Sequence, residues 1–213
     1  MTPSEQSRIA AEICGRAPVI PVLVIEDAAK AGDLAKALVA GGLPALEVTL
    51  RTPAALDAIS AMAAVPGGIV GAGTLLTPAD VVAAKAAGAT FGVSPGSTPR
   101  LLEACAEVGL PLLPGAVTAS EMMALLERGY TVQKFFPAEN VGGAAALKSI
   151  ASPLPQIRFC PTGGITAASA PTYLALPNVV CVGGSWVAPK DKVAAGDWAA
   201  VTALARAADG LAR

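Results

Sequence analysis

The stretch TVQKFFP, residues 131–137, is rich in strand-forming side chains and carries one lysine near its end. As a strand it places Val132, Lys134 and Phe136 on one face, because side chains alternate with a period of two. Lys134 then projects between two apolar side chains, where desolvation disfavours the ammonium and favours a neutral, nucleophilic amine. Imine-forming chemistry requires such an amine. The alternative is an ordinary strand lysine that extends its charged head to water, so the rest of the chain has to decide.

Outward from this stretch, short apolar strands alternate with helices. The expected strands lie at 18–25, 45–51, 69–73, 90–93, 111–114, 131–137, 156–160 and 179–182. The helices that follow them are expected at 27–39, from 53, and at 77–88, 98–108, 118–128, 141–150 and 167–176, with a leading helix at 3–15 and a helical tail at 190–212. Thr118 and Glu121 have the spacing of a capping box.

Eight strand-helix units over about 190 residues match the count and alternation of a (β/α)8 barrel. The competing α/β fold is an open doubly wound sheet. That fold needs no eighth strand, and its usual G-x-G-x-x-G after the first strand is missing. No linker, low-complexity segment or charge block divides the chain. We therefore expect one α/β domain over residues 1–213, a (β/α)8 TIM barrel with an N-terminal helix.

Composition and charge exclude several classes of function. The formal net charge is -1 and no Lys/Arg cluster occurs, so nothing indicates a nucleic-acid or anionic-membrane partner. No apolar run reaches the roughly 18 residues of a transmembrane helix. Residues 1–16 carry charges in place of the apolar segment of a secretory signal. A cytoplasmic protein is expected.

The chain contains no histidine. This excludes Ser-His and Cys-His nucleophile pairs, imidazole acid-base catalysis and imidazole metal ligands. The four cysteines form no C-x-x-C pair and are interpreted as buried small hydrophobes, not as a disulfide framework or a zinc site; they are Cys14, Cys105, Cys160 and Cys181. Chemistry must come from Lys, Glu, Asp, Tyr, Ser, Thr and backbone groups.

The strand at 45–51 alternates apolar side chains with Glu47, Thr49 and Arg51, which share the face toward the barrel interior. Opposite charges there are costly unless they are used or paired. One interpretation is a structural ion pair between Glu47 and Arg51. The other is a general base beside a guanidinium that binds a carboxylate through two hydrogen bonds.

Further candidates follow other strands, at the end of the barrel where active sites form. Thr74 follows a glycine-rich strand end, although Gly-Thr is also common in turns. Pro95 either walls a pocket or fixes a turn. Phe136 shares the face of Lys134 and either excludes water or packs in the core.

Glycine pairs follow the last two strands, in Thr162-Gly163-Gly164 and Gly183-Gly184-Ser185. Barrels commonly bind phosphate at these positions through backbone N–H groups. Two such pairs on adjacent strands favour phosphate binding over plain turns. A desolvated lysine, an interior carboxylate, an arginine and a phosphate site at one rim suit a phosphorylated 2-oxo acid that reacts through a Schiff base.

With these motifs in order, the chain resembles the 2-keto-3-deoxy-6-phosphogluconate (KDPG) and 4-hydroxy-2-oxoglutarate (KHG) aldolases. The match spans roughly residues 18 to 210 and rests on the segments LEVTLRT at 46–52, VGAGT at 70–74, SPG at 94–96, KFFPAE at 134–139, FCPTGGI at 159–165 and GGSW at 183–186. The resemblance implies a metal-independent class I aldolase without a cofactor, typically a homotrimer, that acts in the Entner-Doudoroff pathway.

Transferred by motif, the resemblance makes Lys134 the Schiff-base lysine and Glu47 the proton shuttle. Arg51 and Thr74 would bind the carboxylate at the pyruvate end, with Pro95 and Phe136 lining the pocket. The remaining substrate contacts would come from Thr162, Gly163, Gly164, Gly184 and Ser185, the glycines and serine at the phosphate. One difference is that some relatives carry an arginine at the end of the first strand, where this chain has Val24-Ile25.

The implied reaction is cleavage of KDPG to pyruvate and glyceraldehyde 3-phosphate. The alternatives within the enzyme class are KHG, or the galactonate epimer of KDPG, as the main substrate. Outside that class the chain could be a phosphosugar-binding barrel without activity, although such a protein has no use for a buried nucleophilic amine.

Overall fold

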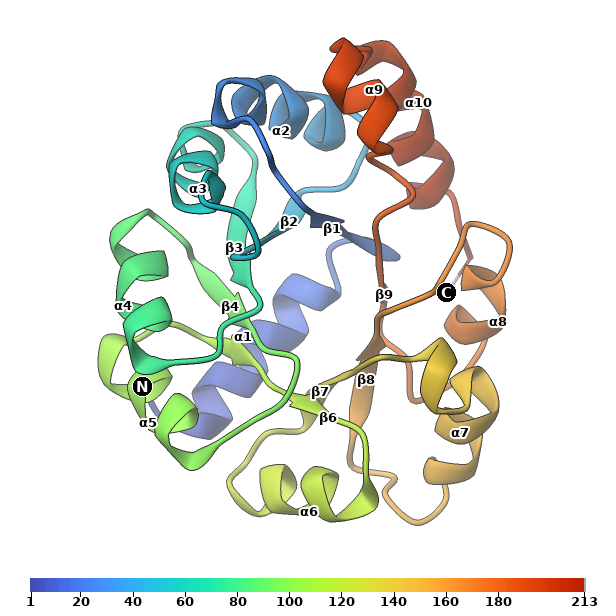
Figure 1. Cartoon of the computed structure of the whole chain (residues 1–213). Coiled ribbons are helices and arrows are strands. Elements are labelled where there is room, and N and C mark those ends of the chain that lie inside the picture. The colour runs from blue at the N-terminus through green and yellow to red at the C-terminus, as the bar shows by residue number, and fades with distance from the viewer. Residues whose placement is uncertain (213) are drawn as a thin grey trace.

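The computed structural model describes residues 1–212 as a ring of strands surrounded by helices (Figure 1). The strands are β1 Val19–Leu23, β2 Ala45–Thr49, β3 Ile69–Gly73, β4 Phe91–Val93, β5 Leu112–Leu113, β6 Gly115–Ala116, β7 Val132–Phe135, β8 Arg158–Pro161 and β9 Val182–Gly184. The α-helices are α1 Pro3–Cys14, α2 Ala31–Ala40, α3 Ala55–Ala63, α4 Pro78–Ala86, α5 Pro99–Val108, α6 Ala119–Glu127, α7 Gly143–Ile150, α8 Ala170–Leu174, α9 Lys190–Ala195 and α10 Trp198–Asp209, with short 3-10 turns η1 Ala28–Lys30 and η2 Glu139–Val141.

All strand pairs are parallel, and the ring they form confirms the predicted barrel. One sheet has the order β5-β4-β3-β2-β1-β9 and the other β6-β7-β8. Isolated bridges from Phe159 to Val179 and from Thr162 to Gly183 join β8 to the β9 segment. On the other side β5 and β6 follow one another across Pro114, pairing with β4 and β7 respectively. They act as one strand of an eight-stranded barrel.

The element boundaries differ from the sequence expectation at several points. The strand expected at 111–114 is two short strands because Pro114 has no N–H to donate, although its carbonyl accepts from the Lys134 N–H at 2.8 Å. The last strand lies at Val182–Gly184 instead of 179–182. Between the two bridges the chain advances three residues along β8 but four along the β9 segment, so this segment contains one extra residue.

Two expected helices are divided. The one expected at 27–39 begins as the 3-10 turn η1, which Asp27 caps as expected by accepting a hydrogen bond from the Ala29 N–H. The tail expected at 190–212 is α9 and α10, separated at Gly196, which adopts φ 69°, and Asp197, which caps α10. The capping box of Thr118 and Glu121 is present at α6.

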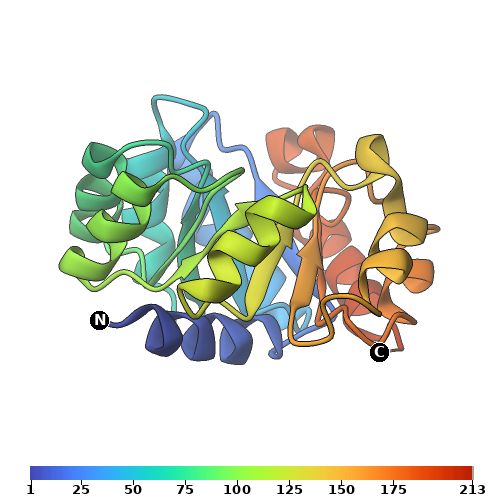
Figure 2. The same cartoon turned by 90° about the horizontal axis from the view of Figure 1, so that it is seen from below.

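Helix α1 closes one end of the barrel (Figure 2). Its Ser7 hydroxyl accepts hydrogen bonds from the N–H groups of Thr131 and Val132 at 2.9 and 3.1 Å. Its apolar face packs on interior side chains that include Phe91 and Val132. Since α1 covers the amino-terminal ends of the strands, the opposite, carboxyl-terminal end is where a site can open.

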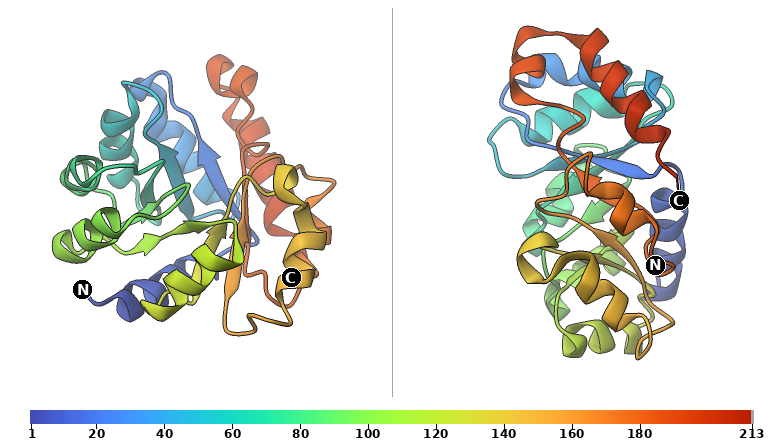
Figure 3. Two further views of the ribbon diagram at one scale, coloured as in Figure 1. Left: turned by 60° about the horizontal axis from the view of Figure 1, so that its bottom comes forward. Right: turned by 90° about the vertical axis from the view of Figure 1, so that its right-hand side faces the viewer.

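A second apolar cluster lies between the strands and the outer helices and includes Leu46 and Val48. This confirms that their strand turns Glu47 and Thr49 to the interior. The last helix, α10, packs against α2 (Figure 3), where Thr202 donates a hydrogen bond to the Ala37 carbonyl at 3.0 Å. Within residues 1–212, no helix is both long and apolar enough to cross a membrane.

Candidate active site

A cavity of about 140 Å³ opens at the carboxyl-terminal end of the strands. Seven of the residues predicted for the site line it, together with Val22 and Thr49: these seven are Lys134, Glu47, Arg51, Thr74, Pro95, Phe136 and Thr162. They come from five of the barrel strands and the loops that follow, so the barrel geometry brings together residues as far apart as 47 and 162.

Lys134 and Glu47 form a buried ion pair at the base of this cavity. The Lys134 Nζ lies 3.0 Å from Oε1 and 3.4 Å from Oε2 of Glu47. The two residues are 5% and 3% exposed, so Lys134 does not extend its head to water. The Phe136 ring centre is 5.5 Å from Nζ. A buried pair is costly to desolvate, which is evidence for a chemical use of these groups.

The alternative ion pair between Glu47 and Arg51 is wrong. β2 ends at Thr49, not at 51, and Arg51 lies in the turn beyond it with an exposed side chain. Within residues 1–212, Arg51 has no ion pair. It therefore sits at the cavity rim, where a guanidinium can bind an incoming carboxylate.

Thr74 and Pro95 lie at the same rim after β3 and β4. Thr74 is a non-glycine residue with φ 61°, a left-handed conformation that is rare for a β-branched side chain. Such strain is concentrated at functional sites. The turn is anchored by the Leu50 N–H, which donates to the Gly73 carbonyl at 2.8 Å.

Gly73 and Gly183 make room for the side chains of the site, a role that the sequence analysis did not give them. A Cβ on Gly73 would lie 2.3 Å from the Glu47 Oε1, and a Cβ on Gly183 would lie 2.2 Å from the Thr162 Oγ1. Only the strand register could have indicated this role. Glu47 pairs with Gly71, two residues before Gly73 on β3, and Thr162 pairs with Gly183. The sequence shows where the glycines are, but it does not show which side chains lie against them in the fold.

The predicted phosphate residues lie beside this cavity and not in its lining. Gly163 and Gly164 both have positive φ, 106° and 78°. The N–H groups of Gly163, Gly164 and Ser185 donate to no acceptor within residues 1–212. The bridge from Thr162 to Gly183 places the two loops next to one another. Successive unpaired N–H groups of this kind form an anion-binding concavity.

The loop after β7 is held against the loop after β8. The Ala138 N–H donates to the Thr162 carbonyl at 2.8 Å, and the Glu139 N–H donates to the Gly163 carbonyl at 3.1 Å. Glu139 in turn accepts a hydrogen bond from the Tyr173 hydroxyl at 2.8 Å. These bonds fix the distance between the lysine strand and the glycine pair.

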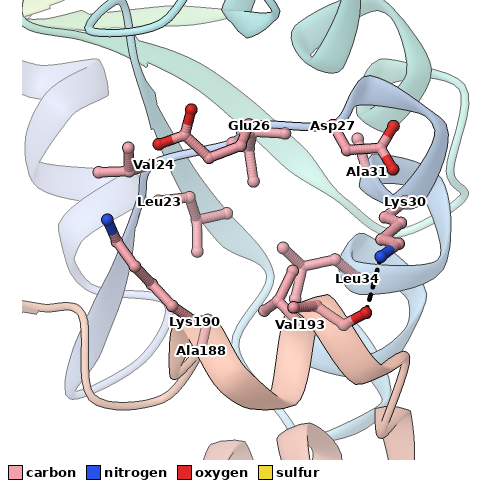
Figure 4. Close-up of a pocket in the computed structure, with 12 residues that line it drawn as sticks. Leu23, Val24, Glu26, Asp27, Lys30, Ala31, Leu34, Ala188, Lys190 and Val193 are labelled. Carbon is pink, nitrogen blue, oxygen red and sulfur yellow. Dashed lines mark hydrogen bonds between the residues drawn. The ribbon is translucent and has the colours of Figure 1, made fainter.

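A larger cavity of about 320 Å³ lies on the outer side of β1, between η1, α2 and α9 (Figure 4). Leu23 lines it, whereas the neighbouring Val22 lines the Lys134 cavity, because adjacent strand residues face opposite sides. Lys30 closes one side by donating to the Ala194 carbonyl at 2.7 Å. Neither Lys134 nor Glu47 lines this larger cavity, so we place the active site in the smaller one.

Comparison with known proteins decides the family. The model of the KDPG and KHG aldolase family matches residues 10–204. The chain belongs to the KDPG and KHG aldolase family. The KHG/KDPG aldolase of Escherichia coli (strain K12) is 53% identical over 192 residues, which cover 90% of each chain.

Two solved aldolase structures are similar throughout. The KDPG aldolase of Zymomonas mobilis ZM4, solved with 3-phosphoglycerate, has a TM-score of 0.93 at 53% identity, covering 97% of this chain and 98% of that one. The KDPG aldolase of Legionella pneumophila has a TM-score of 0.91 at 45% identity, covering 94% and 98%. In that structure pyruvate is captured at low pH as a covalent carbinolamine intermediate.

Proposed function

We propose that this protein is a class I aldolase that cleaves KDPG reversibly to pyruvate and D-glyceraldehyde 3-phosphate. The observation that carries the proposal is the buried pair of Lys134 and Glu47 at the carboxyl-terminal mouth of the barrel. The carbinolamine of the Legionella relative supports it, since that species forms when an amine adds to the pyruvate ketone.

The pair supplies its own nucleophile. A proton passes from the Lys134 ammonium to the Glu47 carboxylate over 3.0 Å and leaves a neutral amine beside a neutral acid. The amine attacks C2 of the 2-oxo acid, and Glu47 returns the proton to the oxygen to form the carbinolamine. Loss of water gives a protonated imine on Lys134.

The imine then acts as the electron sink for carbon-carbon cleavage. Glu47, directly or through a water molecule, removes the proton of the C4 hydroxyl. The C3–C4 bond breaks, its electron pair moves to the imine nitrogen, and glyceraldehyde 3-phosphate leaves. Glu47 protonates the enamine at C3, and hydrolysis of the imine releases pyruvate and the free amine.

The remaining predicted residues hold the two charged ends of the substrate. Arg51 and Thr74 bind the carboxylate next to the ketone, and Pro95 and Phe136 line the pocket around it. The loops of Thr162 to Gly164 and of Gly184 and Ser185 bind the phosphate through backbone N–H groups. The 3-phosphoglycerate in the Zymomonas relative supports a phosphorylated ligand.

A second candidate activity is cleavage of KHG to pyruvate and glyoxylate. The Escherichia coli relative carries both names, KHG and KDPG. Both substrates share the 2-oxo acid end, so Lys134, Glu47 and Arg51 serve them equally. The phosphate loops favour KDPG, and the ratio of kcat/KM for the two substrates measures that preference.

Borohydride trapping tests the proposal. The protein is incubated with pyruvate and sodium borohydride, digested, and analysed by peptide mass spectrometry. We expect a stable adduct on Lys134, and neither the adduct nor turnover in Lys134→Ala. Lys148→Ala, changed on the outer helix α7, is the matched control and should retain both. A folded protein without an adduct would exclude the imine mechanism and favour a phosphosugar-binding protein.

We also propose that the active protein is a cytoplasmic homotrimer, as the family resemblance implies. Sedimentation equilibrium should then give three times the 21.0 kDa chain mass. A monomer mass at working concentration would contradict the assembly without affecting the chemistry proposed for Lys134.

A further inference from the structure

Three cysteines that are far apart in the sequence meet at the closed end of the barrel. Cys14 is the last residue of α1, Cys160 lies on β8, and Cys181 immediately precedes β9. Their Sγ atoms all lie within 4.8 Å of one another, and the residues are 0 to 2% exposed. No short spacing motif announces such a cluster, which is why the sequence analysis interpreted these residues as separate hydrophobes.

The cluster offers three soft sulfur ligands and few other polar groups. Their neighbours are the apolar side chains of the barrel interior, among them Ile13, Ile20 and Val132. The nearest recorded polar contact is the Thr162 hydroxyl, 4.0 Å from the Cys160 Sγ. No histidine exists in the chain, and within residues 1–212 no carboxylate joins the group. A tetrahedral zinc ion would therefore lack its fourth ligand, whereas a three-coordinate thiophile would not.

The spacing suits one central atom. A metal about 2.3 Å from each of three sulfurs in a plane holds them about 4 Å apart, and a pyramidal centre holds them closer still. The three sulfurs need to move by less than an ångström or so to reach this spacing. The three sulfur ligands come from the end of α1 and from two adjacent segments of the barrel. A metal bound to all three would therefore link α1 to the wall of the barrel.

The net charge of the bound complex indicates which thiophilic ion the site can hold. A monovalent ion such as Cu(I) with three thiolates leaves two negative charges in an apolar interior, and a divalent ion leaves one. The ammonium of Lys134 cannot compensate, because Glu47 already pairs with it. A trivalent centre gives a neutral complex.

We propose that Cys14, Cys160 and Cys181 form a binding site for a trivalent thiophilic metalloid, with arsenite as the probe. The reaction is As(OH)3 plus three R–SH giving As(SR)3 plus three H2O. Each step forms one As–S bond and breaks one As–O bond, and each thiol proton leaves with a hydroxide as water. No electron is transferred and no net charge is buried.

The bound state stabilises the fold. Because the site exists only when α1 is docked on the barrel, binding to the native state raises the unfolding temperature. Binding is slow, since the thiols are buried and α1 has to move before arsenite can enter. Neither the cavity of Lys134 nor the loops near the phosphate residues take part in the exchange.

The test is native mass spectrometry and arsenic X-ray absorption on the protein incubated with sodium arsenite. We expect one arsenic per chain, a mass gain of one arsenic less three hydrogens, and three sulfur neighbours with no oxygen. The unfolding temperature should rise with arsenite. Cys14→Ala and Cys181→Ala should each lose the tris-sulfur species, whereas Cys105→Ala, a buried cysteine outside the cluster, should retain it.

Several results would overturn the proposal. These are no arsenic on the wild-type protein, an arsenic centre with retained oxygen, binding that survives Cys14→Ala, or binding that Cys105→Ala removes. The absorption measurement on wild-type protein decides the question even where a variant does not fold. Stoichiometric binding of Cu(I) but not of arsenite would contradict the charge argument.

Discussion

Lys134 and Glu47 are positioned by small residues as much as by their own strands. The Glu47 carboxylate lies against Gly73, two residues beyond its register partner Gly71 on β3, and a Cβ on Gly73 would be 2.3 Å from its Oε1. The proposed catalytic pair therefore requires a residue without a side chain at position 73, and the contact between Thr162 and Gly183 is of the same kind. Because these contacts are so close, a glycine-to-alanine substitution at either position tests whether the space is needed.

Gly73→Ala should lower kcat by about 100-fold, the lower end of what a positioned acid-base group contributes. The new Cβ would lie 2.3 Å from the Glu47 Oε1, so the carboxylate has to turn away from Lys134. Steady-state pyruvate formation measures the loss. Gly96→Ala is the control, since a Cβ there would meet nothing within 4 Å. Equal activity of the two variants would contradict the role of Gly73.

Arg51→Ala should raise KM with a smaller change in kcat. Its side chain is exposed at the rim, forms no ion pair within residues 1–212, and can bind the substrate carboxylate through two hydrogen bonds. Arg51→Lys keeps the charge but not the planar fork, so it should recover only part of the affinity. A loss confined to kcat in Arg51→Ala would instead place this residue in the chemical step.

At the scale of the elements, local sequence signals specify the starts of helices well. Thr77, Thr98 and Thr118 each cap the expected helix with a side-chain oxygen that accepts from the third N–H. Strand ends were harder. Pro114 divides its strand through a missing N–H, and the extra residue before β9 follows from pairing with β8, a partner some twenty residues away.

The acid dependence of the α6 cap follows from Glu121. Hydrogen bonds from the N–H groups of Thr118, foremost, and Val117 lower the pKa of this carboxyl from its ordinary value of 4.5. A lowered native pKa means that the stabilisation is complete above pH 4.5 and is lost as the pH falls through the native value. Urea unfolding should thus show that the stability difference between wild type and Glu121→Gln shrinks in acid. A difference independent of pH would contradict this.

At the scale of the whole molecule, the barrel and the residues of its mouth were predictable because eight strand-helix units leave few alternatives. The period of two within 45–51 and 131–137 then turned Glu47 and Lys134 inward. Their mutual contact, the exposure of Arg51 and the meeting of Cys14, Cys160 and Cys181 were beyond such reasoning. These features depend on how the barrel closes.

Gly115→Ala should weaken that closure. A Cβ on Gly115 would lie 2.3 Å from the Pro95 carbonyl oxygen, a backbone atom that cannot rotate away. We expect a loss of about 1–3 kcal/mol in the free energy of unfolding, the usual cost of overpacking. Activity should fall as well, because Gly115 pairs with Lys134 and Pro95 lines its cavity. Urea titration and pyruvate release measure the two effects. Wild-type values in both would show that the strands can separate freely here.

The one-sided position of Glu47 has a stereochemical consequence. Within residues 1–212 it is the single carboxylate that lines the Lys134 cavity, and the Phe136 ring lies on the lysine as well. An enamine held on Lys134 therefore meets its proton donor on one face only. In heavy water, substrate labelled stereospecifically with tritium at C3 should yield pyruvate whose methyl group is chiral, with one handedness and not a racemate.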